Sequence, residues 1–299
     1  MAETLLYCNN SSNDLSNDSE KFVNTCVDIQ QCVPSSMCLK YIEDFIRPTV
    51  LEWVFIALYC VIFIFGLLGN GLVCFVVFRC RHMQTAVNIF IVNLAIADFM
   101  VILICLPPSL LADTTETWYL GQVMCKVVHF LQTLSVAVSV FTLCAISVER
   151  YFAICHPLRM RFTSVVMWIS ITVIWGMGTL VSLPELLYQR LGRTYPSHFT
   201  EYLTFCTLDL EPDDKQAYQM FLMTGLYGFP MCLMFFAYSV IGVRLCKNSF
   251  PGIQETENGH KGRRSFSTSR PESQLQTRKK AAKMLMTIVV LFALCYLPV

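Results

Sequence analysis

The chain has 299 residues, of which 55% are hydrophobic and only 14% charged, and its formal net charge at pH 7 is +1. Water-soluble domains usually have about a quarter charged residues and slightly less than half apolar ones, so this composition argues against a soluble protein. The near-neutral charge gives no reason to expect a nucleic-acid partner. Several apolar runs exceed the roughly 18 residues that indicate a membrane span, which predicts a polytopic membrane protein.

Six apolar spans are predicted from these runs. In chain order they cover about residues 51–78, 87–111, 123–155, 165–188, 216–246 and 279–299, so the expected fold is an all-α membrane fold. The last run is still apolar where the sequence stops at Val299. We therefore expect the chain to end within its sixth span, with at least one further span and a tail missing.

The charges of the loops predict how the spans are oriented. Basic residues follow the first span at Arg79 and Arg81 and the third at Arg159 and Arg161, and residues 244–283 contain ten Lys/Arg against three Glu. Basic loops face the cytosol, so the N-terminus is expected outside the cell. Acidic residues occupy the opposite loops: Asp113, Glu116, Glu201, Asp209, Glu211, Asp213 and Asp214.

Residues 1–48 are accordingly predicted to form an extracellular segment. Sequons at Asn9, Asn10 and Asn17 are candidate glycan acceptors. They can be glycosylated only if the segment is lumenal, which agrees with this placement. The start has no basic and apolar signal-peptide regions, so the first span is expected to direct insertion. Apolar residues at helical spacing predict an amphipathic helix over 36–47, with an interfacial lead-in to the first span as the alternative.

The cysteines divide by compartment. Cys125 lies at the outer start of the third span and Cys206 in the loop before the fifth, and a bridge between them would hold that loop over the mouth of the bundle. Four others have three possible pairings, or none, and the sequence does not choose among them: Cys8, Cys26, Cys32 and Cys38.

The loop over residues 248–278 is rich in Gly, Ser, Pro, Gln and charge and has no apolar periodicity, which predicts a flexible cytosolic loop. Prolines within or near the ends of spans are expected to bend them: Pro107, Pro108, Pro184, Pro230 and Pro298.

Three polar residues are unusual for their apolar surroundings. Asp98 is the only acid inside the second span, and an ionisable side chain within a membrane indicates function by default. Asn70 and Gln132 lie in the first and third spans, where an interhelical hydrogen bond that only packs the bundle is the alternative reading. Sequence patterns of metalloproteases, serine hydrolases and nucleotide-binding loops are absent, so we do not expect an enzyme.

The polar landmarks resemble those of the rhodopsin-like (class A) G-protein-coupled receptors, in the same order along nearly the whole chain. The matching residues are Gly69-Asn70, Leu94 to Asp98, Glu149-Arg150-Tyr151, Trp175, Pro184, Pro230, Tyr238 and Cys295-Tyr296-Leu297-Pro298.

This resemblance implies a seven-transmembrane helix bundle and a set of roles. Arg150 would be held by Glu149, beside Tyr151, in the inactive receptor and released toward a G protein, with Tyr238 supporting the active state. A plain anchoring pair at the membrane edge is the alternative for Glu149 and Arg150. The resemblance also implies a hinge at Tyr296 and Pro298, and an allosteric sodium ion at Asn70, Asp98 and Ser139; no other cofactor or metal is expected.

A closer resemblance is to the orexin receptors and the allatotropin receptors of invertebrates. It is carried by residues 82–128, 131–143 and 283–298, with Tyr296 and Gln132 as the distinctive positions. It implies a ligand pocket at Ser109, Asp113, Trp118, Gln132, Tyr218, Gln219, Leu222 and Tyr227.

Three positions depart from the orexin receptors. Gln219 stands where they have His, Leu222 where they have Phe, and Glu149-Arg150-Tyr151 where they have Asp-Arg-Trp. The departures favour a receptor that is related to the two vertebrate orexin receptors but is not one of them.

The sequence thus predicts a plasma-membrane receptor for an extracellular, C-terminally amidated neuropeptide of orexin or allatotropin type. The expected partners are the peptide, membrane lipid and a heterotrimeric G protein of the Gq class, with calcium release. The alternatives are a different neuropeptide, a non-signalling receptor, or an ion-coupled transporter, although the inverted repeat of a transporter is not visible.

Overall fold

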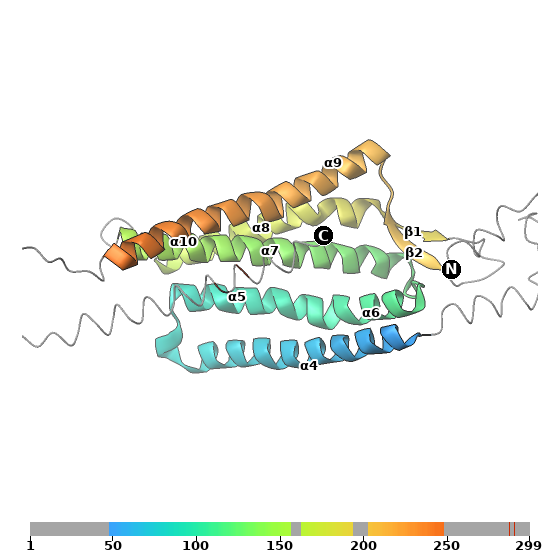
Figure 1. The fold of residues 1–299 in the computed structure, drawn as a ribbon, viewed down its shortest axis with the longest axis horizontal. Helices are drawn as coiled ribbons and strands as arrows, with labels where there is room; N and C mark the ends of the chain where they lie inside the picture. The colour runs from blue at the N-terminus through green and yellow to red at the C-terminus, as the bar shows by residue number, and fades with distance from the viewer. Residues whose placement is uncertain (1–47, 157–162, 194–202, 248–286, 288–289, 291–299) are drawn as a thin grey trace, which may run out of the picture. The chain divides into compact units, whose positions relative to one another are not determined.

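The computed structural model describes residues 48–156, 163–193 and 203–247, together with Thr287 and Val290 (Figure 1). Within this part of the chain, five helical stretches are long and apolar enough to cross a membrane. The expectations for residues 1–47 lie outside the described residues, as do those for loop 248–278 and for the sixth span with Tyr296 and Pro298.

The five stretches follow the chain in order, and two of them consist of two α-helices joined by a π-helical turn. The first two comprise α4 (Val50–Arg79), then α5 (Ala86–Met100), η2 (Val101–Cys105) and α6 (Leu106–Thr115), with the 3₁₀ turn η1 (Arg81–Met83) between them. The others are α7 (Gly121–Cys155), α8 (Ser164–Tyr188), and α9 (Pro212–Leu222) with η3 (Met223–Gly228) and α10 (Phe229–Lys247). Strands β1 (Gln189–Arg193) and β2 (Thr204–Leu208) lie between α8 and α9.

Threonine side chains cap the first turns of three spans. Thr49 and Glu52 form a reciprocal capping box at α4, in which the Thr49 N–H donates to the Glu52 carboxylate and the Glu52 N–H donates to Thr49 Oγ1 at 3.5 Å. Thr85 Oγ1 accepts from the Asn88 N–H at the start of α5, and Thr163 Oγ1 from the Val166 N–H at α8, both at 3.4 Å. These caps satisfy N–H groups that have no intrahelical partner.

Three of the prolines expected to bend helices follow π-helical turns. Turn η2 ends just before α6, whose first turn contains Pro107 and Pro108, and η3 ends just before Pro230 in α10. Proline has no N–H to donate to the preceding turn, and a wider turn accommodates the unpaired carbonyl and the ring. Pro184 instead lies inside α8.

The chain divides into two compact units. The first comprises Met1–Gly69, Phe99–Gln132 and Leu183–Leu210, and the second comprises Asn70–Asp98, Thr133–Ser182 and Glu211–Val299. The long helices contribute residues to both.

The first unit contains an antiparallel hairpin of β1 and β2. Leu191 pairs with Cys206 at its centre, and the register runs from Gln189 opposite Leu208 to Arg193 opposite Thr204. The core of this unit includes Cys105, Trp118, Cys125 and Val128, against which Leu191 and Cys206 of the hairpin pack. The hairpin is therefore part of the core and not a loose surface loop.

The second unit is held partly by a chain of hydrogen bonds through three helices. Trp175 Nε1 of α8 donates to Asn93 Oδ1 of α5 at 2.9 Å, and Asn93 Nδ2 donates to Thr142 Oγ1 of α7 at 2.9 Å. Asn93 is 4% exposed and Thr142 is fully buried. Buried polar groups need such partners, so this network fixes how the helices of the unit pack.

Replacing Trp175 with Phe removes the donor and leaves the ring volume mostly intact. We expect a loss of about 1 kcal/mol in unfolding free energy, because the Asn93 carbonyl loses its partner, and a fall of roughly 2–4 °C in melting temperature in detergent. Thr172→Val on the same helix is the control, since Thr172 Oγ1 donates only to Trp168 O and the residue is exposed. Equal melting temperatures for the two variants would show that the network contributes nothing.

Candidate functional site

The hairpin is covalently attached to the start of α7. Cys125 and Cys206 form a disulfide across 81 residues of sequence, with their Cα atoms 5.8 Å apart. The bridge expected between these two residues is therefore present. It joins the centre of β2 to the first turns of the longest helix of the structure.

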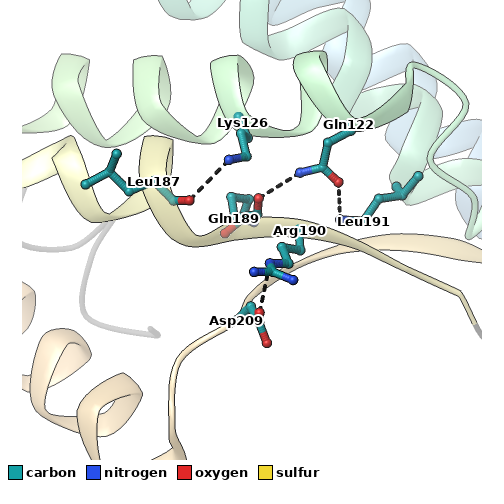
Figure 2. Close-up of polar contacts among 7 residues, drawn as sticks. All are labelled: Gln122, Lys126, Leu187, Gln189, Arg190, Leu191 and Asp209. Carbon is teal, nitrogen blue, oxygen red and sulfur yellow. Dashed lines mark hydrogen bonds and ion pairs between the residues drawn. The ribbon is translucent and has the colours of Figure 1, made fainter.

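The side-chain amide of Gln122 holds the outer edge of β1 (Figure 2). Its Nε2 donates to the Gln189 carbonyl oxygen at 2.8 Å, and its Oε1 accepts from the Leu191 N–H, also at 2.8 Å. These are the backbone groups that a neighbouring strand would bond, because residues two apart on a strand present them to the same side. The amide of one side chain thus takes the place of one residue of a third strand.

Two further polar contacts lie around the base of the hairpin (Figure 2). Lys126 Nζ, one helical turn after Gln122, donates to the Leu187 carbonyl oxygen at 3.1 Å near the end of α8. Arg190 Nε and Asp209 Oδ2 form an ion pair at 2.8 Å, with exposed fractions of 71% and 55%. An ion pair this exposed contributes little stability, so the amide and lysine contacts do more of the holding.

The loop between α6 and α7 holds the start of β2. The Trp118 N–H donates to the Thr204 carbonyl oxygen at 2.8 Å, and Thr204 Oγ1 donates to the Trp118 carbonyl oxygen at 2.6 Å. Thr117 Oγ1 accepts from the Leu203 N–H at 3.0 Å. The Trp118 indole donates to the carbonyl oxygen of Gly121, whose φ of +71° is a conformation that glycine adopts without strain.

An exposed aromatic ring covers the middle of the hairpin. A Cβ atom at Gly192 would lie 2.6 Å from Cε2 of Phe205, its cross-strand partner, so the Phe205 ring lies directly over the glycine. Phe205 is 48% exposed. The hairpin therefore presents an apolar surface on the face opposite its core-packed side.

The Gln122 contacts give a direct test of what holds β1 in place. Gln122→Glu keeps the acceptor for the Leu191 N–H but sets a charge against the Gln189 carbonyl, and Gln122→Leu removes both bonds. We expect faster amide exchange across β1 in both variants, by roughly tenfold for each 1.4 kcal/mol of local stability lost. Gln84→Glu, an exposed site in the other unit, is the matched charge control and should leave that exchange unchanged. Unchanged exchange in all three proteins would contradict the assignment.

The hairpin and its Gln122 and Lys126 contacts were not predicted from the sequence. Each strand has only five residues, and Gln189–Arg193 has none of the apolar–polar alternation that indicates a half-buried strand. The only available signal was Cys206, whose bridge to Cys125 requires the loop to approach α7.

Four predicted pocket residues lie in the first unit, and their environments differ. Asp113 is exposed and accepts a hydrogen bond from the Tyr59 hydroxyl at 2.9 Å, a partner that sequence reasoning missed. Gln132 is exposed and Ser109 is half-buried. Trp118 is only 6% exposed, so it supports the hairpin more than it presents a contact surface.

The other four predicted pocket residues lie in the second unit. The Tyr218 hydroxyl donates to the Val181 carbonyl oxygen at 3.1 Å, which fixes its ring against α8. Gln219 is exposed, and Leu222 and Tyr227 are half-buried. Leu222 packs against a core cluster of Ala137, Val181 and Leu226.

Two of the three residues expected in the central polar cluster are hydrogen bonded. The Asn70 side chain of α4 contacts the Asp98 carboxylate of α5 through a hydrogen bond. Ser139 on α7 is half-buried in the same unit. The neighbouring Ser135 hydroxyl donates to the Ala97 carbonyl oxygen at 2.9 Å, which links α7 and α5 at this level.

Glu149 and Arg150 form an ion pair near the end of α7. Arg150 Nε lies 2.9 Å from Glu149 Oε2, and the two side chains are 27% and 13% exposed. Tyr238 of α10 is 4% exposed and is hydrogen bonded to Ser147, one turn before Arg150. All four predicted switch residues belong to the second unit: Glu149, Arg150, Tyr151 and Tyr238. The ring of Tyr151 lies edge-on against that of Phe152.

His129 lies close to both sulfur atoms of the bridge, a grouping with the ligand types of a metal site. The two cysteines are bonded to each other and therefore have no thiolate to offer a metal. His129 Nδ1 is 2.8 Å from the Cys125 carbonyl oxygen, and its ring lies against Trp118. The histidine is explained by packing and a backbone hydrogen bond.

Comparison with known proteins identifies the family. Residues 69–299 match the family model described as "7 transmembrane receptor (rhodopsin family)". Similar proteins include neuropeptide FF receptor 2 of Mus musculus, 31% identical, and of Rattus norvegicus, 32% identical, each over 275 residues. The alignments cover 88% of this chain and 63% of each relative, so the chain spans less than two thirds of their length. The family consists of receptors and not of enzymes, and the chain, a multi-pass helical membrane protein, belongs to the rhodopsin family of seven-transmembrane receptors.

Proposed function

We propose that the protein is a plasma-membrane receptor that binds an extracellular, C-terminally amidated neuropeptide and activates a heterotrimeric G protein. The observation that carries this proposal is the Glu149–Arg150 ion pair at one end of α7, a helix whose other end is bonded through Cys125 to the hairpin. One helix therefore connects a rigid loop structure with a partly solvated, breakable charge pair. A ligand changes the state of such a pair only if it binds one conformation more tightly than the other.

The proposed class of peptide is supported by two candidate pocket residues and by the names of the two relatives. Gln132 offers a neutral amide, which suits hydrogen bonding to an amidated C-terminus, and Asp113 offers an exposed carboxylate to a basic residue. The two relatives are named as neuropeptide FF receptors. We propose a peptide of orexin or allatotropin type, with a peptide of neuropeptide FF type as the second candidate. The coupling proposed is to the Gq class with calcium release, and Asp98 with Asn70 and Ser139 would hold a sodium ion.

The test is a calcium assay on cells that express the full-length protein. We would apply orexin-type, allatotropin-type and neuropeptide FF-type amidated peptides, each beside its free-acid form. A potent response to one amide and a much weaker response to its acid would support both the peptide class and the coupling. Surface-expressed receptor that responds to none of the peptides would contradict the ligand assignment, and Gln219 and Leu222 would be the first positions to re-examine.

A further inference from the structure

Within the first unit, helix α4 packs along one narrow stripe of its surface. From Ile56 to Gly66, its half-buried residues are Ile56, Tyr59, Phe63 and Gly66, and the residues between them are exposed. These positions recur every three or four residues, so they lie on the same face of the helix. A Cβ atom at Gly66 would lie 2.7 Å from Cδ1 of Ile102, which shows that this face approaches η2 closely.

Tyr59 adds a hydrogen bond to this packing, closer to the start of α4. Its hydroxyl donates to Oδ2 of Asp113, in the last turn of α6, at 2.9 Å. Tyr59 lies about two helical turns before Gly66, so its ring is held in the same half-buried stripe. Asp113 is exposed, and an exposed side chain ordinarily moves among several rotamers. The hydrogen bond from Tyr59 therefore selects one orientation of the carboxylate.

That orientation leaves the second carboxylate oxygen of Asp113 available. In the parts of the chain that the structure describes, no hydrogen bond or ion pair reaches its Oδ1. An ionised carboxylate has about four lone-pair sites, so the single bond from Tyr59 leaves most of them unused. Asp113 thus presents an acceptor that is charged and fixed in direction.

The electrostatic surroundings of Asp113 favour a cation. Asp113 and the C-cap residue Glu116 lie at the C-terminal end of α6, where the helix dipole contributes partial negative charge. The last turn of α6 contains no basic residue, and neither carboxylate forms an ion pair within the described residues. Two carboxylates and a helix C-terminus without a counter-ion attract a positively charged group from outside the chain.

We propose that Tyr59 is a positioning residue for the basic side chain of the peptide, because it orients the Asp113 carboxylate so that Oδ1 receives the peptide's ammonium or guanidinium group. This inference rests on the proposed function, which assigns Asp113 to a basic residue of the peptide. Fixing the carboxylate beforehand spares the peptide the cost of ordering it, which strengthens binding. Tyr59 acts through Asp113, so its effect on affinity depends on the peptide's positive charge.

The same hydrogen bond has a rival role of opposite sign. If the Tyr59 hydroxyl competed with the peptide for the carboxylate, removing it would strengthen binding. The unused Oδ1 of Asp113 favours orientation over competition, since the cation and the hydroxyl can be bound together. The direction of the affinity change separates the two roles.

The variant Tyr59→Phe removes the hydroxyl and keeps the ring in the stripe. In the full-length protein, we expect it to reach the cell surface and to bind the amidated peptide that gives the strongest calcium response about fivefold more weakly, as for the loss of one hydrogen bond. Tyr188→Phe is the matched control, since Tyr188 is exposed in the same unit and its hydroxyl forms no hydrogen bond with the described residues. Affinity in Tyr59→Phe that equals or exceeds that of the control would overturn the inference.

Neutral forms of the peptide separate positioning from a general effect on the fold. Each basic residue of the peptide is replaced in turn by a neutral one of similar shape, citrulline for arginine or norleucine for lysine. When the residue that pairs with Asp113 is neutral, the natural protein and Tyr59→Phe should bind the peptide with affinities within about twofold of each other. A fivefold loss that persists with every neutral peptide would assign Tyr59 a structural role alone and sink the proposal.

A double-mutant cycle tests whether Tyr59 acts through Asp113. In the Asp113→Ala protein the hydroxyl has lost its partner, so adding Tyr59→Phe should change affinity by less than about twofold. Losses that simply add would contradict the proposed coupling. Binding that is independent of Tyr59 overturns this inference and leaves the receptor assignment intact, whereas binding of none of the amidated peptides overturns both.

Discussion

Removing the bridge between Cys125 and Cys206 is expected to abolish high-affinity peptide binding and to reduce surface expression strongly. The bond closes a loop of 81 residues, for which the chain-entropy relation gives about 4.5 kcal/mol of stabilisation. It also anchors β2 at the centre of the hairpin, between the contacts of Gln122 and Trp118. The Cys125→Ser/Cys206→Ser double variant avoids leaving one reactive thiol, and surface labelling with peptide saturation binding measures both effects.

Cys60→Ser is the matched control for this change. Cys60 lies in the same unit, is exposed and is not bonded to another cysteine. We expect it to retain normal expression and affinity. If the double variant binds peptide as tightly as the Cys60 variant, the hairpin is held by its hydrogen bonds alone and the bridge has no role in binding.

Replacing Arg150 with Ala is expected to remove signalling while peptide binding is retained. The ion pair with Glu149 lies at the end of α7, and the Arg150 side chain is 27% exposed, so its charge is accessible to a partner. Loss of the guanidinium removes the group that we propose contacts the G protein, and the maximal calcium response should fall at least tenfold. The disulfide and hairpin contacts all lie in the other unit, so affinity for the peptide should change less than threefold.

Glu149→Gln provides the opposite change at the same pair. It removes the charge that holds Arg150 but keeps the size of the side chain, so we expect higher signalling without peptide. Arg81→Ala is the control for the loss of one exposed basic charge and should signal normally. Full signalling by the Arg150 variant would contradict the switch role and indicate that Glu149 and Arg150 only anchor the helix at the membrane edge.

The long helices were predictable because apolar length alone specifies a membrane span. The five described spans begin and end within four residues of the predicted positions, with the largest differences at Thr115 and Pro212. These extensions lie at polar ends, where capping and not hydropathy sets the boundary. Thr49 and Glu52 illustrate this, since their capping box starts α4 and hydropathy does not detect it.

The hairpin could not be predicted from hydropathy because its stability comes from elsewhere in the chain. Leu191 and Cys206 face a core built by Trp118, Cys125 and Val128 of other elements. In the sequence, Gln122 is simply a polar residue at the start of a helix. Only the structure shows that its amide bonds two backbone groups of β1, the Gln189 carbonyl and the Leu191 N–H. Tertiary contacts of this kind leave no periodic signal in a five-residue strand.

The sequence named candidate site residues, but it specified few of the contacts that they make. The pairing of Arg150 with Glu149 was expected from the resemblance, and the structure shows it at 2.9 Å. The hydrogen bond from the Tyr59 hydroxyl to Asp113 was not expected. Trp118 was assigned to the pocket, whereas its burial at 6% and its bonds to Thr204 and Gly121 explain it as a support of the hairpin. Burial depends on neighbours distant in sequence, and a single sequence does not specify them.

The most direct test of the central proposal is nucleotide exchange on a heterotrimeric G protein in membranes that contain the full-length receptor. We would measure exchange with and without the amidated peptide that gives the strongest calcium response, for the natural protein and for Arg150→Ala. We predict that the peptide stimulates exchange several-fold through the natural protein and has no effect through the variant. Saturable peptide binding that leaves exchange unchanged in the natural protein would contradict a signalling receptor and leave a protein that only binds its peptide.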